Sequence, residues 1–492
     1  MQERKNDAEY AGSSAVAQEI DPDVTLTSTT ERKLMTKMDL HLLPVLCVLY
    51  ILAFLDRVNI SNAVIFGLKE DLGIESGNKY NTALTIFFVP YITLEIPSNI
   101  LLKKFKPHLW LSGCMVGFGL VTLCQGFVQT YAGLLATRFL LGLFETGMVP
   151  GCVYLLGMWY KRSEAQTRFS FFFCSTTLAG AFGGMLASVI GKMHGMRGYL
   201  GWRWIFILEG LLTCVFSCAF FFIIPDFPED VKWLNEEERA FIRAKLAKDV
   251  GAAGHEVSLG WKDVLDVFKD YMIIIGGLMN LGLVVPAYGY AYFAPTIIKT
   301  HGYGPIETQI YSIPPWAAAF GFSLTVSYLS DRLRNRFAFT LFPICMAIAG
   351  FAILLNVHGV AHRTVQYAAL LLITCGTYSA LPIIICWFTM NLGGHKRRAV
   401  GAAWQVGFGN IGGIIATYSF LEKDRPAFRP GHTISILFMG FAGAMCIVYF
   451  LLIMHRNRSR DRVAAVDRRG VPDQTAAAPL EGDLSPSYRY QL

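Results

Sequence analysis

Four ionisable residues interrupt apolar stretches in the first third of the sequence. Asp56 and Arg57 lie well inside the run HLLPVLCVLYILAFLDRVNI, and Arg138 and Glu145 flank the apolar part of RFLLGLFETG. Each such group costs about 2.5–3.5 kcal/mol to insert at the centre of a membrane-spanning helix. Ionisable residues in spans mark ion or substrate paths and proton relays, although an Asp–Arg clamp between helices is the structural alternative. The pattern favours a transporter that moves an anion together with protons.

The two residue types supply complementary chemistry for such transport. An arginine fork binds a carboxylate bidentately. A carboxyl group removed from water can take and release a proton near neutral pH. If ionised Asp56 pairs with an arginine, protonation of Asp56 frees that arginine for the substrate. Proton and anion loading would then favour each other.

Spacing predicts how these groups are arranged. Arg138 and Glu145 are seven residues apart, so they share a helix face about 10 Å apart along the axis. Gly142 lies between them and leaves room for a partner or a ligand. The two arginines are expected at a comparable depth, with Asp56 above them and Glu145 below. This order predicts a vertical relay.

Several other polar residues inside apolar runs leave alternatives open. Tyr91, Glu95 and Asn99 form an i, i+4, i+8 stripe. Glu95 is either a third titrating acid or a satisfied interhelical hydrogen-bond partner. Asn410, which follows Gly409, is expected to face the ligand.

Aromatic and acidic residues in two further spans are weaker candidates. Tyr288, Tyr290 and Tyr292 either stack on a ring substrate or serve packing. Glu209 is expected to be a helix-packing partner of Arg203. Neither group is assigned to the transport site.

Composition defines the class of protein. The chain has 492 residues, of which 53% are hydrophobic and 16% charged, whereas a soluble protein carries about a quarter charged residues. Apolar runs near twenty residues match the length of a membrane-spanning helix. The polar start MQERKNDAEY is not a signal peptide, so the first span is retained. The chain is an integral membrane protein with an expected all-α fold.

The charge and the cysteines exclude other classes. The net charge of +7 comes from basic residues in short loops, which argues for membrane topology rather than nucleic-acid binding. The eleven cysteines are scattered through apolar runs and predict neither a disulfide framework nor a metal site. No cofactor is expected, and there is no phosphate loop, nucleophile elbow or other catalytic motif, so we expect no enzyme.

The apolar runs predict twelve helices in two groups of six. Residues 1–35 are expected to be a disordered N-terminus, 36–225 a first six-helix bundle, 226–270 a linker, 271–455 a second bundle and 456–492 a disordered tail. NEEERAFIRAKLAKD predicts an amphipathic helix in the linker. The predicted spans are 41–62, 81–102, 108–129, 131–154, 166–190, 203–225, 271–297, 307–330, 337–356, 364–390, 398–420 and 432–454.

Lysine and arginine residues predict the orientation of the chain. Basic clusters follow spans two, four, eight and ten, and the linker and the tail are also basic-rich. All of these segments fall on one side if there are twelve spans. The positive-inside rule makes that side the cytosol and places both termini there. Two basic loops, after spans five and eleven, do not follow this rule because they fall on the opposite side.

The six-plus-six arrangement resembles the major facilitator superfamily. After span eight, SYLSDRLRNR resembles its Asp-Arg loop signature, which implies that Asp331, Arg332 and Arg336 clamp the cytoplasmic helix ends. The corresponding loop after span two, PSNILLKKFK, has Lys103 and Lys104 where the signature places Asp-Arg. The implied fold is two six-helix bundles that rock about a central site.

Narrower motifs resemble the anion:cation symporter family, above all its fungal allantoate, nicotinate, pantothenate and biotin permeases. They are LDRVNISNA, LEIPSNILLKK, RFLLGLFETGMVPG, GWRWIFILEGLLT, YFAPTIIKTHGY, NLGGHKRRAVGAA and GNIGGIIATY. The resemblance implies that Asp56 and Glu145 carry the coupling proton and that Arg57 meets the substrate carboxylate. It also implies that the substrate cavity is lined by Arg138, Tyr91 and Asn410.

The leading interpretation is therefore a proton-coupled symporter that imports a small organic anion, such as a carboxylate vitamin or a ureide, across the plasma membrane. We expect it to function as a monomer. An exporter of a pathway metabolite shares the same features. A non-transporting nutrient sensor is the alternative from another class, although the sequence offers no long cytoplasmic domain for it.

Overall fold

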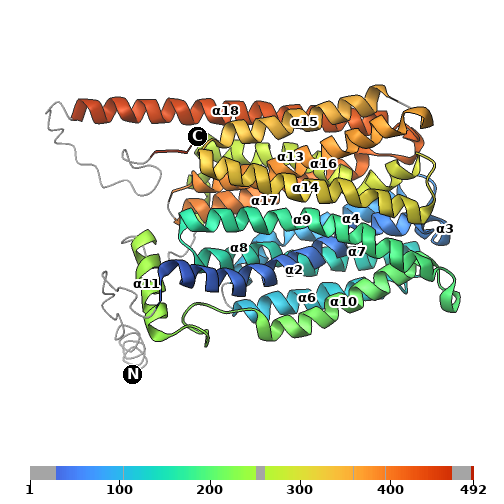
Figure 1. Cartoon of the computed structure of the whole chain (residues 1–492), viewed down its shortest axis with the longest axis horizontal. Helices are drawn as coiled ribbons and strands as arrows, with labels where there is room; N and C mark the ends of the chain where they lie inside the picture. The colour runs from blue at the N-terminus through green and yellow to red at the C-terminus, as the bar shows by residue number, and fades with distance from the viewer. Residues whose placement is uncertain are drawn as a thin grey trace.

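The computed structural model describes residues 29–102, 105–250, 261–357, 359–393, 395–467 and 489–491. The described part of the chain is helical throughout and contains no strand. Most of its helices lie along the long axis of an elongated body (Figure 1). The predicted all-α fold is confirmed.

The N-terminal half forms one bundle, in the lower part of Figure 1. Its spans are single helices or pairs of helices joined at a break, and short helices cap its loops. They are α2 (Glu31–Ile65), α4 (Lys79–Thr93) with α5 (Glu95–Leu102), α6 (Pro107–Gln125), α7 (Tyr131–Glu145) with α8 (Met148–Trp159), α9 (Arg162–Ile190) and α10 (Gly201–Ile223), together with α3 (Leu68–Asp71), η1 (Gly191–Met193) and η2 (Met196–Gly198).

The C-terminal half forms the second bundle, and the linker contributes two helices. The bundle consists of α13 (Tyr271–Lys299), α14 (Pro305–Leu333), α15 (Arg336–Asn356), α16 (Arg363–Met390), α17 (His395–Ser419) and α18 (Arg429–Asp467), with the short η4 (Val360–His362) and η5 (Glu422–Asp424). The linker helices are α11 (Glu236–Val250) and α12 (Trp261–Phe268). The helix predicted in the linker is present as α11.

Twelve spanning elements are present in the described residues. Nine helical segments are long and apolar enough to cross a membrane, and α14, α17 and the broken α4–α5 pair complete the set. The two breaks fall where proline removes a backbone donor. Pro97 lacks the N–H that would bond to Thr93, the last residue of α4, and Pro150 lacks the one that would bond to Thr146, between α7 and α8.

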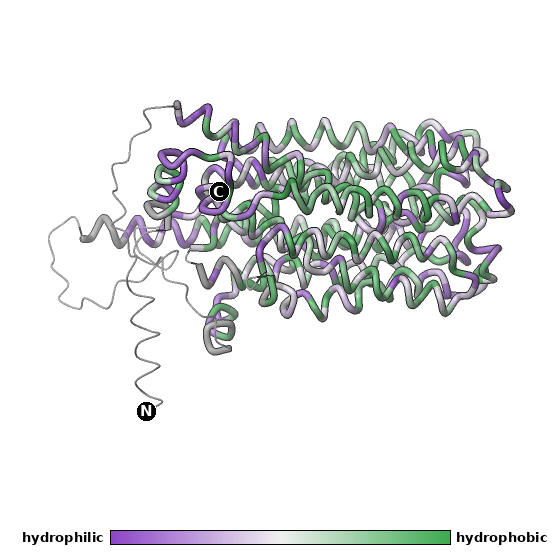
Figure 2. Tube along the Cα trace, turned by 90° about the horizontal axis from the view of Figure 1, so that it is seen from below, coloured by the Kyte–Doolittle hydropathy of each residue, from purple (hydrophilic) through white to green (hydrophobic). Residues whose placement is uncertain are grey.

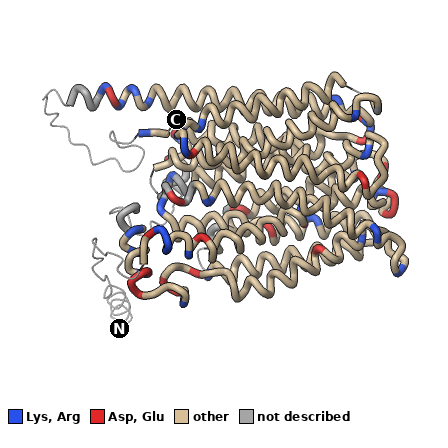
Figure 3. The backbone as a smooth tube through the Cα atoms, viewed as in Figure 1, with Lys and Arg blue, Asp and Glu red and all other residues tan. Residues whose placement is uncertain are grey.

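Hydropathy and charge follow the long axis of the body. Apolar residues predominate along its middle, and hydrophilic residues gather at its two ends (Figure 2). Lysine, arginine, aspartate and glutamate are concentrated at the same ends (Figure 3). We call the end with α11, the start of α2 and residues 489–491 the loop end, and the end with α3 and η1 the far end.

The two bundles touch along their whole length. Helices α9 and α14 run side by side at the boundary (Figure 1), and Gly180 permits this approach, because a Cβ there would lie 2.3 Å from the Trp316 ring. Towards the far end, the Thr85 and Thr417 hydroxyls of α4 and α17 lie 2.6 Å apart. Helix α13 packs against α2 in the centre.

The structure corrects two predicted boundaries. Helix α2 begins at Glu31, so residues 31–35 belong to the first span rather than to a disordered N-terminus. Helix α18 continues past Arg456 to Asp467, and residues 489–491 pack on the second bundle. The predicted disordered tail is therefore wrong for these two stretches. The predictions for residues 1–28, 468–488 and 492 lie outside the described residues.

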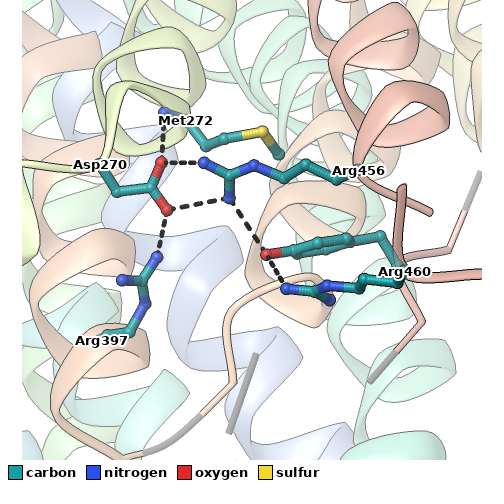
Figure 4. Close-up of polar contacts among 6 residues, drawn as sticks. Asp270, Met272, Arg397, Arg456 and Arg460 are labelled. Carbon is teal, nitrogen blue, oxygen red and sulfur yellow. Dashed lines mark hydrogen bonds and ion pairs between the residues drawn. The ribbon is translucent and has the colours of Figure 1, made fainter. Parts of the chain in front are cut away.

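A charged cluster joins the described C-terminal residues to the loop end. Asp270, the N-cap of α13, accepts hydrogen bonds from the Met272 amide, from Arg397 of α17 and from Arg456 of α18 (Figure 4). Arg456 also donates to the Tyr490 hydroxyl at 3.1 Å. Burial alone would raise the pKa of the Asp270 carboxyl, but these hydrogen bonds outweigh it and hold the pKa below its ordinary value.

Candidate functional site: a buried arginine centre between the bundles

Arg57 of α2 and Glu145 of α7 form an ion pair in the centre of the molecule. Arg57 Nε donates to Glu145 Oε1 at 2.9 Å, and Nη2 donates to the same oxygen. The side chain of Glu145 is fully buried, and that of Arg57 is 4% exposed. Glu145 Oε2 has no hydrogen-bond partner. The carboxylate therefore uses one oxygen to hold two guanidinium donors.

The second bundle supplies a further hydrogen-bond partner for the Arg57 guanidinium. Its Nη1 donates to the Tyr288 hydroxyl of α13, and that hydroxyl donates to Asn410 Oδ1 of α17 at 3.4 Å. The guanidinium lies 5.0 Å from the ring centroid of Phe87 and 4.9 Å from that of Tyr91, both on α4. Cation–π attraction stabilises a guanidinium in such a position. The sequence-predicted residues Arg57, Glu145, Tyr91 and Asn410 thus meet in one place.

Tyr288 was a weak candidate in the sequence, and Phe87 carried no signal there. The alternatives for the tyrosines of α13 were stacking on a substrate or packing. The structure gives Tyr288 a third position, as the link between Arg57 and Asn410. A direct contact between spans one and seven joins residues 231 positions apart, which no local spacing reveals.

Arg138 lies at the same depth as Arg57, as predicted. Its Nη1 donates to the Arg57 carbonyl oxygen at 2.9 Å, and its Nε and Nη2 have no hydrogen-bond partner. Gly142, between Arg138 and Glu145, serves packing rather than ligand space. A Cβ at Gly142 would lie 2.1 Å from the Phe87 carbonyl oxygen, so this glycine lets the α4 backbone approach α7.

Asp56 points to a different set of neighbours. The Thr213 hydroxyl of α10 donates to Asp56 Oδ2 at 3.1 Å. Glu145, rather than Asp56, is the acid in contact with an arginine in this conformation. The expected pairing of ionised Asp56 with an arginine is therefore absent: Arg57 pairs with Glu145, and Asp56 is turned into the first bundle.

The predicted packing of Glu209 against Arg203 is wrong. Arg203 donates to Asp71 Oδ2 at 2.8 Å near the far end. Glu209 instead accepts a hydrogen bond from the Asn59 amide of α2. Helix α10 thus presents Glu209 to α2 and packs on α6 as well.

Glu95 lies beside the arginine centre, within electrostatic range of Tyr91 and Tyr288. Its side chain on α5 is buried, and its Oε2 would be 2.9 Å from a Cβ at Gly407 of α17. Glu95 Oε2 has no hydrogen-bond partner. The side chain of Asn99, the third member of the stripe, is outside the described residues.

The predicted loop clamp bridges the bundles through Asp331. Asp331 pairs with Arg336 in the second bundle and accepts from the Thr167 hydroxyl of α9, in the first bundle, at 3.0 Å. Arg332 is exposed and lies outside this contact. At the far end, Lys69 of α3 pairs with Glu422 of η5 at 2.5 Å. The bundles are thus in contact at both ends, on either side of the buried centre.

The chain belongs to the major facilitator superfamily. The profile described as Major Facilitator Superfamily matches residues 46–417, most of both bundles. The members of this superfamily are membrane transporters, and the protein is accordingly a multi-pass membrane transporter rather than an enzyme. The predicted fold of two six-helix bundles is confirmed.

Relatives and solved structures agree with this assignment. The chain is 32% identical to "MFS transporter prlL" of a fungal species (strain NRRL 50135), with 89% of each chain covered. It is 32% identical to "Uncharacterized transporter C1002.16c" of Schizosaccharomyces pombe, with 89% and 87% covered. The solved proton:xylose symporter XylE is similar in fold, with a TM-score of 0.66, 13% identity and 85% and 96% of the two chains covered.

Proposed function

We propose that this protein is a secondary active transporter that couples proton movement to the symport of a small organic anion. The observation that supports this function is the single-oxygen contact between Glu145 and Arg57, in a closed centre shared by both bundles. A buried guanidinium is costly unless it is hydrogen-bonded or paired with an anion. Glu145 is the anionic partner of Arg57 in the structure, and a substrate carboxylate can replace it.

Exchange of the partner of Arg57 explains the coupling. Protonation of Glu145 removes its negative charge, so the Nε and Nη2 donors of Arg57 become available to the substrate carboxylate. Deprotonation restores the Glu145–Arg57 pair and expels the anion. The proton and the anion therefore load together and leave together. Tyr288 and Asn410 connect the partner exchange at Arg57 to the second bundle. Both lie on helices of that bundle, and the Tyr288 hydroxyl links Arg57 to Asn410.

The lining indicates the substrate class. The Arg57 guanidinium, which can bind a carboxylate, is surrounded by the rings of Phe87, Tyr91 and Tyr288. A small planar or amide-containing carboxylate fits this chemistry, such as nicotinate, pantothenate or allantoate. The proton coupling that the name of the fold neighbour XylE states for that protein is consistent with this proposal.

We place the transporter in the plasma membrane as a monomer, with the loop end and both termini in the cytosol. The basic residues of the loop end and the positive-inside rule support this orientation. A cysteine introduced beyond Arg456 should not react with a membrane-impermeant thiol reagent added outside sealed cells. It should react after the cells are permeabilised. Labelling from outside in sealed cells would reverse the orientation.

Transport in liposomes tests the function directly. Purified protein is reconstituted, and uptake of labelled nicotinate, pantothenate and allantoate is measured with and without a pH gradient that is alkaline inside. At least one anion should accumulate only with the gradient, and a protonophore should abolish the accumulation. Accumulation of that anion without a gradient, or uptake that prefers a neutral analogue, would contradict the proposal.

A further inference from the structure

A second pair of buried acids lies inside the first bundle, away from the arginine centre. Asp56 on α2 accepts from Thr213 on α10, and Asn59 on α2 donates to Glu209 on α10. Residue 56 precedes 59 while 213 follows 209, so the two contacts are neighbouring rungs between antiparallel helices. One helical turn separates the rungs, which is about 5 Å along the axis. The two carboxyl groups therefore lie on adjacent rungs.

Each carboxyl group of this pair has an unsatisfied oxygen. Asp56 is 1% exposed and Glu209 3% exposed, and both Asp56 Oδ1 and Glu209 Oε1 have no hydrogen-bond partner. Such groups are costly to bury unless a donor reaches them. A proton held on one of the two acids would supply a donor to this region.

Helix α6 brings unpartnered polar groups to the same region. The Thr122 hydroxyl is fully buried and faces the Asp56 carboxyl, but its geometry falls short of a hydrogen bond. Gln125, one turn further on the same buried face of α6, is also fully buried, and neither atom of its amide has a partner. Gly210 lets the helices meet here, because a Cβ there would lie 2.4 Å from the Leu123 nitrogen.

Of the two arginines near the pair, Arg57 is engaged elsewhere, whereas Arg138 keeps two nitrogens without a hydrogen-bond partner. Arg57 holds Glu145 and Tyr288, whereas Arg138 lies within electrostatic range of Asp56 and donates to the Arg57 carbonyl. Glu145 adds negative charge on the side of α7. Cys214 lies beside Asp56, and Cys218 and Cys124 lie beside Cys214. Further along the packed helices, Arg203 is bound to Asp71, His108 of α6 to Asp226 and Arg168 of α9 to Asp39.

We infer that Asp56 and Glu209 form a second proton-binding pair, which takes up one further proton in each transport cycle. An O–H bond forms on one carboxyl group when the proton arrives, and that hydroxyl donates to the free oxygen or amide beside it. When the proton leaves, Arg138 is the cation able to approach ionised Asp56. This inference rests on the proposed proton symport and adds Glu209 to its machinery.

The proton-to-anion stoichiometry tests this pair. The experiment uses liposomes with the membrane potential clamped at zero and a pH gradient of about one unit. The measured quantity is the ratio of internal to external anion concentration at which net flux stops. Two protons for each anion balance about a hundredfold anion ratio, and one proton balances about a tenfold ratio. Wild type should stop near the larger ratio, and Glu209→Gln, which keeps an acceptor for Asn59, should stop near the smaller one.

Two further variants separate proton binding from a structural role. Glu209→Asp keeps a titratable group and should retain the larger ratio. Asp71→Asn removes an acid that also binds α10, through Arg203 and Trp202, and should leave the ratio unchanged. If Glu209→Gln does not reconstitute, infrared difference spectra of wild type and Glu209→Asp decide the question, because a protonated buried carboxyl should appear in both and shift between them.

The failures are distinguishable. A wild-type ratio near tenfold, or the same large ratio in Glu209→Gln, would overturn the pair while leaving proton symport intact. Uptake that needs sodium in wild type and loses this need in Glu209→Gln would make the pair a sodium site and also overturn the inference. Absence of any effect of the pH gradient on wild type would instead refute the proposed function itself.

Discussion

Arg57 donates two hydrogen bonds to a single carboxylate oxygen of Glu145, Oε1, while Oε2 has no hydrogen-bond partner. A guanidinium and a carboxylate that are both fully engaged would use two parallel hydrogen bonds to two oxygens. The observed contact leaves half of the acid's hydrogen-bonding capacity unused. Glu145 is thus held firmly enough to neutralise a buried charge, and its free oxygen can accept a proton.

Arg57→Lys should weaken anion uptake severely. Lysine keeps the charge but loses the planar fork, and each lost charge-assisted hydrogen bond is worth about 1.5–3 kcal/mol. We expect the KM for the anion to rise about ten- to a hundredfold, with normal membrane insertion, in liposome uptake assays. Arg332→Lys, an exposed arginine on the same protein, should behave like wild type. Normal uptake by both Arg57→Lys and Arg57→Ala would remove Arg57 from the site.

Gly142→Ala should lower stability because the added methyl group meets backbone. The Cβ would lie 2.1 Å from the Phe87 carbonyl oxygen and 3.0 Å from Pro90 Cγ. Overpacking of this kind costs typically about 1–3 kcal/mol, which should appear as a lower Tm of the detergent-solubilised protein. Gly157→Ala is the matched control, since a Cβ there meets nothing within 4 Å. Equal Tm values for the two variants would show that α4 and α7 are not closely packed.

Asp270 should support the loop end in a pH-dependent way. Its pKa lies below the ordinary value in the folded protein, so its stabilising effect is complete above the unfolded pKa, near 4. That stabilisation is lost as the pH falls through the lower folded pKa. Asp270→Asn should lower the free energy of unfolding by about 3 kcal/mol at pH 7 and flatten its decline under acid.

Asp266→Asn is the control for that experiment. Asp266 lies one turn before Asp270 and pairs with Lys269 on the surface, where both side chains are mostly exposed. Exposed pairs contribute about 0–1 kcal/mol, so the Tm should hardly move. The account of the loop end would be contradicted if the two aspartate variants had the same stability and the same response to acid.

Cys386 should report opening of the loop end. Its side chain on α16 is buried, with its sulfur 3.6 Å from the Ser170 hydroxyl of α9 across the bundle boundary. In a variant that keeps only this cysteine, maleimide should react slowly. Adding Asp331→Asn, which weakens the contacts with Arg336 and Thr167, should speed the reaction several-fold.

A variant that keeps only Cys446 provides the comparison for this labelling. Cys446 is fully buried on α18 inside the second bundle, so separation of the bundles should leave it protected. If Asp331→Asn changes the labelling of both cysteines equally, the substitution loosens the whole protein rather than the loop end.

The sequence was informative where chemistry is local. Asp56, Arg57, Arg138 and Glu145 are conspicuous because charge is expensive in an apolar span, and their burial follows directly from that pattern. The depth shared by Arg57 and Arg138 also followed from counting residues along two antiparallel spans. The breaks after Thr93 and Glu145 coincide with Pro97 and Pro150 one turn later, a signal that was present in the sequence.

The sequence was uninformative where rotation of one helix against another decides the contact. Glu209 and Arg203 lie six residues apart on α10 and seemed natural partners, but α3 supplies Asp71 to the arginine and α2 supplies Asn59 to the acid. Likewise, which acid faces Arg57 depends on the turn of α2 between α7 and α10. The role of Tyr288 depends on docking of two bundles that are separated by the linker.

Glu145→Gln tests the central claim most directly. Glutamine mimics the protonated acid and cannot release a proton, so Arg57 stays available to the anion. Net uptake driven by a pH gradient should fall to background in liposomes, whereas exchange of labelled for unlabelled anion between two loaded sides should persist, because exchange needs no proton release. Accumulation of the anion by Glu145→Gln against its gradient, as in wild type, would show that Glu145 does not carry the coupling proton and would contradict the account.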